Sequence, residues 1–160
     1  MPDPRNPDVA PRASQPQATA ERVRAHMIAD DHATRALGID VVSIGPGTAH
    51  ARMAVRQDML NGFAICHGGL ITTLADTAFA YACNAYGEVT VASGLGIDFI
   101  APAHLGDVLD AQCTEQTMNG RTGVYDVIVN NQRGERIALF RGRSHRLKGK
   151  QVVAPAAAPR

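Results

Sequence analysis

The stretch GLITTLADTAFAYACNAYG, residues 69–87, decides the fold of this chain. Its apolar side chains recur at helical spacing and form one broad stripe: Leu70, Ile71, Leu74, Ala75, Ala78, Phe79 and Ala82. Asp76 is the only charged residue of the stretch. A helix without a charged solvent face is normally buried all round. We therefore predict a helix over about residues 68–85, stopped by Gly87 and enclosed by a sheet or covered further by a partner subunit.

Strand patterns lie on both sides of this helix. Before it, residues 37–47 and 48–57 form two strand-like segments around a Gly-Pro-Gly turn, and the second segment alternates apolar with polar side chains. After it come four more strand-like segments, at residues 89–102, 106–118, 122–132 and 135–147. Strands of this length suit a strongly curved antiparallel sheet around a long helix. The order of elements predicts an α+β chain with the hotdog fold, a long central helix wrapped by a curved antiparallel sheet.

The two ends of the chain differ in composition from the middle. Residues 1–18 are rich in proline, alanine and glutamine, and residues 149–160 repeat that character. Both are predicted to be disordered tails, which leaves a single domain at residues 19–148. Thr19 is expected to cap a helix that runs to Arg35 and carries Val23, Met27 and Ile28 on one side.

Composition and charge exclude several classes of function. The formal net charge is +1 and no basic run is long enough to neutralise a polynucleotide, which disfavours nucleic-acid binding. No apolar stretch reaches membrane-spanning length, and the N-terminus lacks the apolar core of a secretory signal. The three cysteines have no CxxC spacing and the histidines have no metal-ligand spacing. We expect a cytoplasmic protein without a metal or a membrane partner.

Four motifs occur together along the chain. They are Asn61-Gly62, then His67-Gly68-Gly69, then LADTAFA on the helix, then a proline and a Gly-Asp pair after the next strand. In this combination the sequence closely resembles the phenylacetate-degradation (PaaI-type) hotdog thioesterases, from about residue 37 to residue 146. The resemblance implies hydrolysis of aromatic acyl-CoA thioesters, such as phenylacetyl- or hydroxyphenylacetyl-CoA. It also implies a homo-oligomer, a dimer or a dimer of dimers (homotetramer), with the substrate between subunits and no cofactor beyond the CoA of the substrate.

The resemblance assigns three residues to the reaction. Asp76 acts on the thioester, the backbone amide of Gly68 polarises its carbonyl, and Asn61 lines the site. Helix N-terminal amides lack intrahelical partners and lie at the positive end of the helix, so Gly68 and Gly69 can present N–H groups to an oxyanion. Asp76 can act as general base or as nucleophile, and the sequence leaves both open. Without the surrounding motif, a buried structural carboxylate would be the better interpretation of Asp76.

Further residues are expected to bind the substrate: His67, Gly69, Thr77, Phe63, Thr72, Arg121 and Arg143. Phe63 and Thr72 would border a short, flat, apolar slot for an aromatic ring. The two arginines would meet the phosphates of CoA, although a solvated strand face explains either arginine at least as well.

His67 is expected to tether its loop through a hydrogen bond or to border the thioester site. A nucleophilic Cys66 activated by His67 is disfavoured, because adjacent residues on an extended segment point to opposite sides. Two other functions remain open. A hotdog dehydratase would need a histidine paired with a carboxylate on the central helix, and this helix carries only Asp76. A non-catalytic acyl-CoA binding protein would use the same pocket. An assay of the free thiol released from acyl-CoA would separate a thioesterase from both alternatives.

Overall fold

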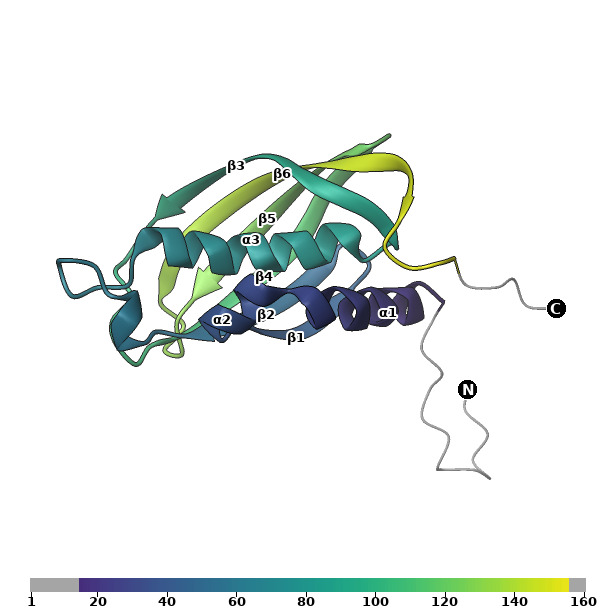
Figure 1. Cartoon of the computed structure of the whole chain (residues 1–160). Coiled ribbons are helices and arrows are strands. Elements are labelled where there is room, and N and C mark those ends of the chain that lie inside the picture. Colours follow the sequence, from purple (N-terminus) through teal and green to yellow (C-terminus); the bar gives the residue numbers. More distant parts are fainter. Residues whose placement is uncertain (1–14, 156–160) are drawn as a thin grey trace, which may run out of the picture.

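The computed structural model describes residues 15–155. Figure 1 shows its elements, which follow one another along the chain as α1 (Gln15–Asp30), α2 (His32–Leu37), β1 (Asp40–Gly45), β2 (Thr48–Ala54), the 3-10 turn η1 (Gln57–Met59), α3 (Gly68–Asn84), β3 (Glu88–Phe99), β4 (Val108–Asn119), β5 (Thr122–Asn130) and β6 (Arg136–Gln151).

The strands form one curved antiparallel sheet in the order β1-β2-β4-β5-β6-β3. The long helix α3 lies across the hollow of the sheet, and α1 runs beside it near the β1 edge (Figure 1). A long helix wrapped by a curved antiparallel sheet is the hotdog fold, so the predicted fold is confirmed. No helix within residues 15–155 has the combination of length and apolar character that crossing a membrane requires.

Helix α3 begins and ends close to the predicted bounds. His67 is its N-cap, and Gly87, with φ +92°, takes the chain out of the helix in a left-handed conformation. Its inner stripe packs on the sheet: Phe79 lies 5.4 Å from the ring of Tyr125 and 5.8 Å from that of Phe140, measured between centroids. A Cβ at Gly142 would lie 2.9 Å from the Phe79 ring, so only glycine at this position leaves room for the ring.

A second face of α3 is covered from within the chain. The hydroxyl of Tyr81, which is 1% exposed, donates a hydrogen bond to Asp31 Oδ2 at 3.1 Å. Asp31 joins α1 to α2, so this pair ties the central helix to the N-terminal helices. The remaining face carries half-buried residues, Thr72, Asp76, Thr77 and Ala80. The absence of a charged solvent face therefore has two causes within one chain, the sheet and the N-terminal helices.

The N-terminal helix differs from the prediction. It begins at Gln15, so Thr19 is not a cap, and the Thr19 hydroxyl instead donates to Gln15 O at 3.1 Å within the helix. Pro16 lies in the first turn, where a missing N–H breaks no intrahelical bond. The expected single helix to Arg35 is broken at Asp31, whose side chain accepts from Thr34 N at 3.0 Å and caps α2.

Burial of α1 and of the C-terminal segment extends the predicted domain. Val23 is buried and Met27 packs against the core, whereas Ile28 is 37% exposed, contrary to the prediction. At the other end β6 continues to Gln151, and Val152 and Val153 pack against the core. The predicted tails are therefore too long, by residues 15–18 and 149–153. Residues 1–14 and 156–160 lie outside the described residues.

The two outer strands of the sheet, β1 and β3, each pair on one side only in the described residues. Strand β3 leaves large apolar side chains open, since Leu95 is 42% and Phe99 53% exposed. Both residues pair with buried positions of β6, Leu95 with Gly142 and Phe99 with Ala138, and therefore point to the side of the sheet that carries α3. The β3 edge thus combines unpaired backbone with uncovered apolar surface.

Candidate functional site

The start of α3 presents one free backbone amide. His67 Nδ1 accepts a hydrogen bond from Gly69 N at 3.0 Å, and His67 O accepts from Leu70 N and Ile71 N. The N–H of Gly68 has no acceptor within residues 15–155. The prediction that His67 tethers the loop is confirmed. The prediction that Gly69 also exposes its N–H is wrong, because the His67 side chain occupies that donor.

Asn61 organises the loop that faces this amide. Its Oδ1 accepts from Phe63 N at 2.9 Å and from Ile65 N at 3.4 Å, and its backbone N–H donates to Ile65 O at 2.8 Å. These bonds fold residues 61–65 into a tight turn, in which Ala64 takes a positive φ of 58°. Because Oδ1 is occupied, the amide NH2 of Asn61 is the part of its side chain that is free to donate.

A cavity of about 510 Å³ joins these groups. It is lined by Asn61, Ile65 and Cys66 of the loop, Gly68 and Ile71 of α3, and residues 99–103, which begin with the last residue of β3. Cys66 N donates to Ala103 O at 2.8 Å and so links the two sides of the cavity. The cavity is mostly apolar, with the Gly68 amide and Asn61 as polar groups on its wall. It can hold an acyl group whose carbonyl oxygen meets the Gly68 N–H.

Phe99 is a cavity residue that the sequence interpretation missed. Its ring lies against Gly68: a Cβ built on Gly68 would be 2.9 Å from Phe99 Cζ. The predicted wall residue, Phe63, is 86% exposed at the tip of the loop and does not line the cavity. Within one chain the cavity is therefore lined by Phe99 and not by Phe63, and the predicted role of Phe63 at a site between subunits stays a prediction. The sequence places Phe99 at the end of a predicted strand, in the segment Ile97-Asp98-Phe99 before Pro102. The period-two alternation of that strand does not show which of its two faces carries the site.

Asp76 lies two turns further along α3, on its half-buried face. Eight residues correspond to about 12 Å along a helix axis. Burial raises the pKa of Asp76 above its usual 3.8. The carboxylate has no hydrogen-bond or ion-pair partner in the part of the chain that the structure describes. It does not line the cavity of Gly68 and Asn61, so one chain does not bring the three predicted catalytic residues into one pocket.

The threonines near Asp76 are bonded to their own helix. Thr72 Oγ1 donates to Gly68 O and Thr77 Oγ1 to Thr73 O, both at 2.8 Å. Their hydroxyl protons are therefore already used, and each hydroxyl retains only acceptor capacity for a ligand. Neither threonine lines the cavity, contrary to the prediction that Thr72 borders the slot.

The predicted arginines lie far from the cavity in the same chain. Arg121 O accepts from Arg146 N, and Arg146 pairs with Thr90, which is bonded to Asn84 at the C-terminal end of α3. Arg121 is thus at the end of α3 opposite to Gly68, a helix length of about 25 Å away. Arg143 lies between two buried neighbours of β6 and points to the other side of the sheet, over Gly94. Neither guanidinium has an ion-pair partner among residues 15–155.

Cys66 is poorly suited to nucleophilic chemistry. The residue is 3% exposed, and burial raises the pKa of its thiol. Its Sγ lies 3.8 Å from His67 O, while His67 Nδ1 is bonded to the Gly69 amide. The thiol has neither a base nor access to solvent, which agrees with the expectation that Cys66 is not the nucleophile.

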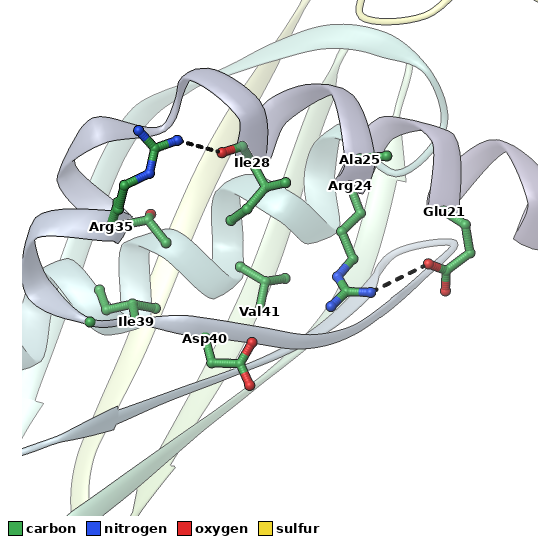
Figure 2. A pocket seen from close by; sticks show the side chains of 10 residues that line it. Glu21, Arg24, Ala25, Ile28, Arg35, Ile39, Asp40 and Val41 are labelled. Carbon is green, nitrogen blue, oxygen red and sulfur yellow. Dashed lines mark hydrogen bonds and ion pairs between the residues drawn. The ribbon is translucent and has the colours of Figure 1, made fainter.

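A second cavity, of about 610 Å³, lies between α1, α2 and β1 (Figure 2). Its apolar lining includes Ile39 and Val41, and Arg24 pairs at 3.7 Å with Glu21, one turn earlier on α1. Arg35 turns back to donate to Ile28 O and Ala29 O at the end of α1. This cavity borders β1, at the edge of the sheet opposite to β3, and it has no free helix amide comparable to Gly68.

Known proteins match most of the chain. A family model described as the thioesterase superfamily matches residues 63–138. The acyl-coenzyme A thioesterase PaaI of Escherichia coli (strain K12) is 48% identical over 123 residues, which are 77% of this chain and 88% of that protein. The structure of the E. coli PaaI protein from the phenylacetic acid degradation operon has a TM-score of 0.82, covering 84% of this chain and 97% of that chain at 45% identity.

Two further structures support the likeness. A mutant of the phenylacetic acid degradation protein PaaI from Thermus thermophilus is 37% identical, with a TM-score of 0.71 over 73% of this chain and all of that chain. A Streptococcus mutans UA159 protein, described as bound to acetyl CoA, is 27% identical, with a TM-score of 0.67 over 71% of this chain and 90% of that chain.

Proposed function

The chain belongs to the thioesterase superfamily and is an acyl-CoA thioesterase of the PaaI type, and from this premise we propose that it hydrolyses aromatic acyl-CoA thioesters, phenylacetyl- or hydroxyphenylacetyl-CoA, to the free acid and CoA. One observation carries the proposal: Gly68, whose N–H has no acceptor among residues 15–155, lines an apolar cavity of about 510 Å³ together with Asn61. This cavity is large enough for a phenyl ring. The operon named for the E. coli relative points to the same class of acid.

The Gly68 amide supplies the electrophilic half of the reaction. A thioester carbonyl oxygen that accepts from this N–H develops negative charge at the positive end of α3 when the carbonyl carbon is attacked. The free NH2 of Asn61 lies on the same cavity wall and can donate a second hydrogen bond to the carbonyl or to the attacking water. The tight turn at residues 61–65 fixes that group before the substrate arrives.

Asp76 supplies the other half. As general base it takes a proton from water while the water oxygen attacks the carbonyl carbon, and the tetrahedral intermediate then expels CoA as its thiolate, which the proton of Asp76 neutralises. As nucleophile it forms an acyl anhydride that water hydrolyses in a second step. Both routes need a carboxylate that is ionised yet little paired, and a pKa raised by burial makes it a better base.

We further propose that the complete site forms between two copies of the chain. In one copy the cavity contains Gly68 and Asn61 but not Asp76. Pairing of two β3 edges would cover Leu95 and Phe99, continue the sheet, and bring the half-buried face of one α3 toward the start of the other. Asp76 of the partner subunit would then face the carbonyl held at Gly68.

The same arrangement gives the arginines a role. An antiparallel pair of β3 strands carries the far end of one subunit toward the cavity of the other. Arg121 of the partner subunit would approach the mouth of the site, and the unpaired cations Arg121 and Arg143 are the proposed contacts for the CoA phosphates. The acetyl-CoA complex of the Streptococcus mutans relative supports a CoA-binding groove in this fold. Three free thiols, Cys66, Cys83 and Cys113, suit the reducing cytoplasm as the proposed compartment.

The variant Asp76→Asn tests the catalytic assignment. We expect kcat for phenylacetyl-CoA to fall at least about a hundredfold, the scale of a lost acid-base or nucleophilic group. Folding should be kept or improved, because the carboxylate has no hydrogen-bond or ion-pair partner within residues 15–155 and its ionised form is penalised by burial. Near-normal turnover by a folded Asp76→Asn protein would refute the assignment.

A matched control is Asp126→Asn. Asp126 accepts two hydrogen bonds from Arg141, at 2.6 and 2.7 Å, and this ion pair lowers the pKa of its carboxyl. Its loss should cost about 0.2 to 1 kcal/mol of stability, as for a surface pair, and leave kcat unchanged. We therefore expect the two variants to show opposite patterns: Asp76→Asn loses activity and keeps stability, whereas Asp126→Asn loses a little stability and keeps activity.

The acyl group is tested by kcat/KM for phenylacetyl-, hydroxyphenylacetyl-, benzoyl-, hexanoyl- and palmitoyl-CoA. A preference for palmitoyl-CoA would contradict the aromatic assignment and leave the thioesterase assignment intact.

A further inference from the structure

Phe99 occupies a special position in the cavity. It is the last residue of β3, and the ends of its ring, Cζ, Cε1 and Cε2, lie 2.9, 3.2 and 3.3 Å from the place of a Cβ on Gly68. The ring therefore covers the Cα of the residue whose amide receives the carbonyl. Yet Phe99 is 53% exposed, so nothing within residues 15–155 encloses the rest of this large apolar side chain. Packing within the chain does not explain an aromatic ring at this place.

The other walls of the cavity are held by backbone contacts. Ile137 O accepts from Ile100 N at 2.8 Å and from Ala101 N at 3.3 Å, which fixes the segment after Phe99 to the start of β6. Cys66 N donates to Ala103 O and closes the far side, and Ile71 on α3 is 3% exposed. Phe99 is thus the large side chain of the cavity that stands next to the carbonyl position and is not held by surrounding side chains.

We infer that Phe99 is a specificity-determining residue, whose ring contacts the acyl group next to the carbonyl and favours flat aromatic acyl groups over straight chains. The inference rests on the proposed function and adds a residue to it. A carbonyl bound at Gly68 places the next one or two acyl carbons against the Phe99 ring. In a phenylacetyl group one methylene separates the aromatic ring from the carbonyl carbon, so this ring meets the Phe99 ring with an offset or tilted geometry. A flexible chain at the same place loses rotamer freedom without gaining this contact.

The size of the effect follows from aromatic pairing. A pair of rings is worth about 0.5 to 1.5 kcal/mol beyond the area it buries, which corresponds to about two- to tenfold in relative kcat/KM. We therefore expect Phe99→Leu, which keeps the bulk and loses the ring, to lower the ratio of kcat/KM for phenylacetyl-CoA to that for octanoyl-CoA by this factor. Both acyl groups contain eight carbon atoms, so the comparison holds size constant. Phe99→Ala, which also empties the space, should lower the ratio further.

The experiment measures this ratio by thiol release for the wild type, Phe99→Leu, Phe99→Ala and Leu105→Ala, with sedimentation to check that the oligomer is kept. Leu105 is 54% exposed and does not line the cavity, so its variant should leave the ratio unchanged. An equal fall of kcat/KM for both substrates in both Phe99 variants would show a purely structural ring and overturn the inference. If Phe99→Ala loses the oligomer, Phe99→Leu alone decides. A wild type that hydrolyses octanoyl-CoA faster would refute the aromatic function, while a lowered ratio in Phe99→Leu would still support the role of the ring.

Discussion

Replacement of Gly68 by proline removes the one amide to which we assign carbonyl polarisation. Gly68 is the first residue of α3, where proline fits the helix and loses no intrahelical hydrogen bond. His67 has φ −61° and ψ 129°, a conformation that a following proline accepts. The Gly68 N–H has no acceptor among the described residues. Gly68→Pro should therefore fold, and its reduced unfolded-state entropy, typically about 0.4 to 1 kcal/mol, opposes the cost of moving the Phe99 ring away from the new Cβ.

The magnitude of the loss is that of a missing oxyanion donor. Removing one such donor typically lowers kcat by about a hundred- to a thousandfold, or about 2.7 to 4 kcal/mol. Any Cβ at this position also approaches the Phe99 ring to 2.9 Å, which forces the ring to shift. Gly68→Ala brings the same Cβ but keeps the N–H, so it is the matched control. The ratio of kcat for the alanine variant to that for the proline variant removes the contribution of the Cβ and leaves the replacement of the N–H by the proline ring.

The assay is release of CoA thiol at saturating phenylacetyl-CoA, with thermal unfolding of both variants. We expect Gly68→Pro to be at least about a hundredfold slower than Gly68→Ala, at a Tm equal to or above that of the alanine variant. Proline and alanine variants of similar kcat, both folded, would show that the Gly68 amide does not polarise the carbonyl. A large fall of Tm in the proline variant would show that the amide has a structural acceptor.

Three further outcomes are expected. Cys66→Ala should keep most activity, because burial raises the pKa of that thiol and no base activates it; complete loss of kcat in a folded variant would restore the cysteine mechanism. A mixture of inactive Asp76→Asn and Gly68→Pro subunits should regain thiol release when hybrids form, because one of the two shared sites then has both wild-type groups; no recovery in proven hybrids would place both groups in one subunit. Asp76→Asn should unfold at a higher temperature than the wild type at pH 7, because burial raises the folded-state pKa of Asp76 and the ionised carboxylate therefore destabilises the folded protein. This difference in Tm should vanish below about pH 3.8, where the carboxyl is protonated in both folded and unfolded chains.

The central helix could be predicted because several signals agree there. The apolar stripe, the single charge and Gly87 all depend on local spacing, and the structure places the helix within one residue of the prediction. The long strands were predicted for the same reason, since alternation and turn residues are local. The hotdog fold then follows, because a long helix with no charged face needs the sheet that these strands form.

The errors occur where distant contacts override local pattern. Asp31 interrupts the N-terminal helix because it caps α2 and also accepts from Tyr81, fifty positions away in sequence. Val152 belongs to the fold because its N–H donates to Gly87 O, at the far end of α3. Helical spacing predicts one unbroken helix through Asp31, and composition predicts a disordered tail at Val152; neither pattern carries information on such pairings.

The chemical roles assigned to the site residues stay predictions, whereas their positions can be compared with the structure. The sequence indicates that Gly68, Asn61 and Asp76 have chemical roles, but it does not show that His67 occupies the Gly69 amide. The sequence analysis names Phe63 for the cavity wall and does not name Phe99, which β3 brings next to Gly68 in space. A residue supplied by a neighbouring strand cannot be found from motif spacing alone.

The environment of Asp76 explains why stability alone does not account for this residue. An aspartate in the middle of a helix is a weak helix former, and half-burial with no partner in the described part of the chain makes its charge unfavourable. By contrast, the carboxylates Asp107 and Asp126 each have an arginine partner and a lowered pKa. We propose that the partners of this group, which weakens the fold, arrive with the substrate and the second subunit. On this argument the cost in stability and the capacity for catalysis have the same origin, an unpaired carboxylate held at a fixed position on a rigid helix.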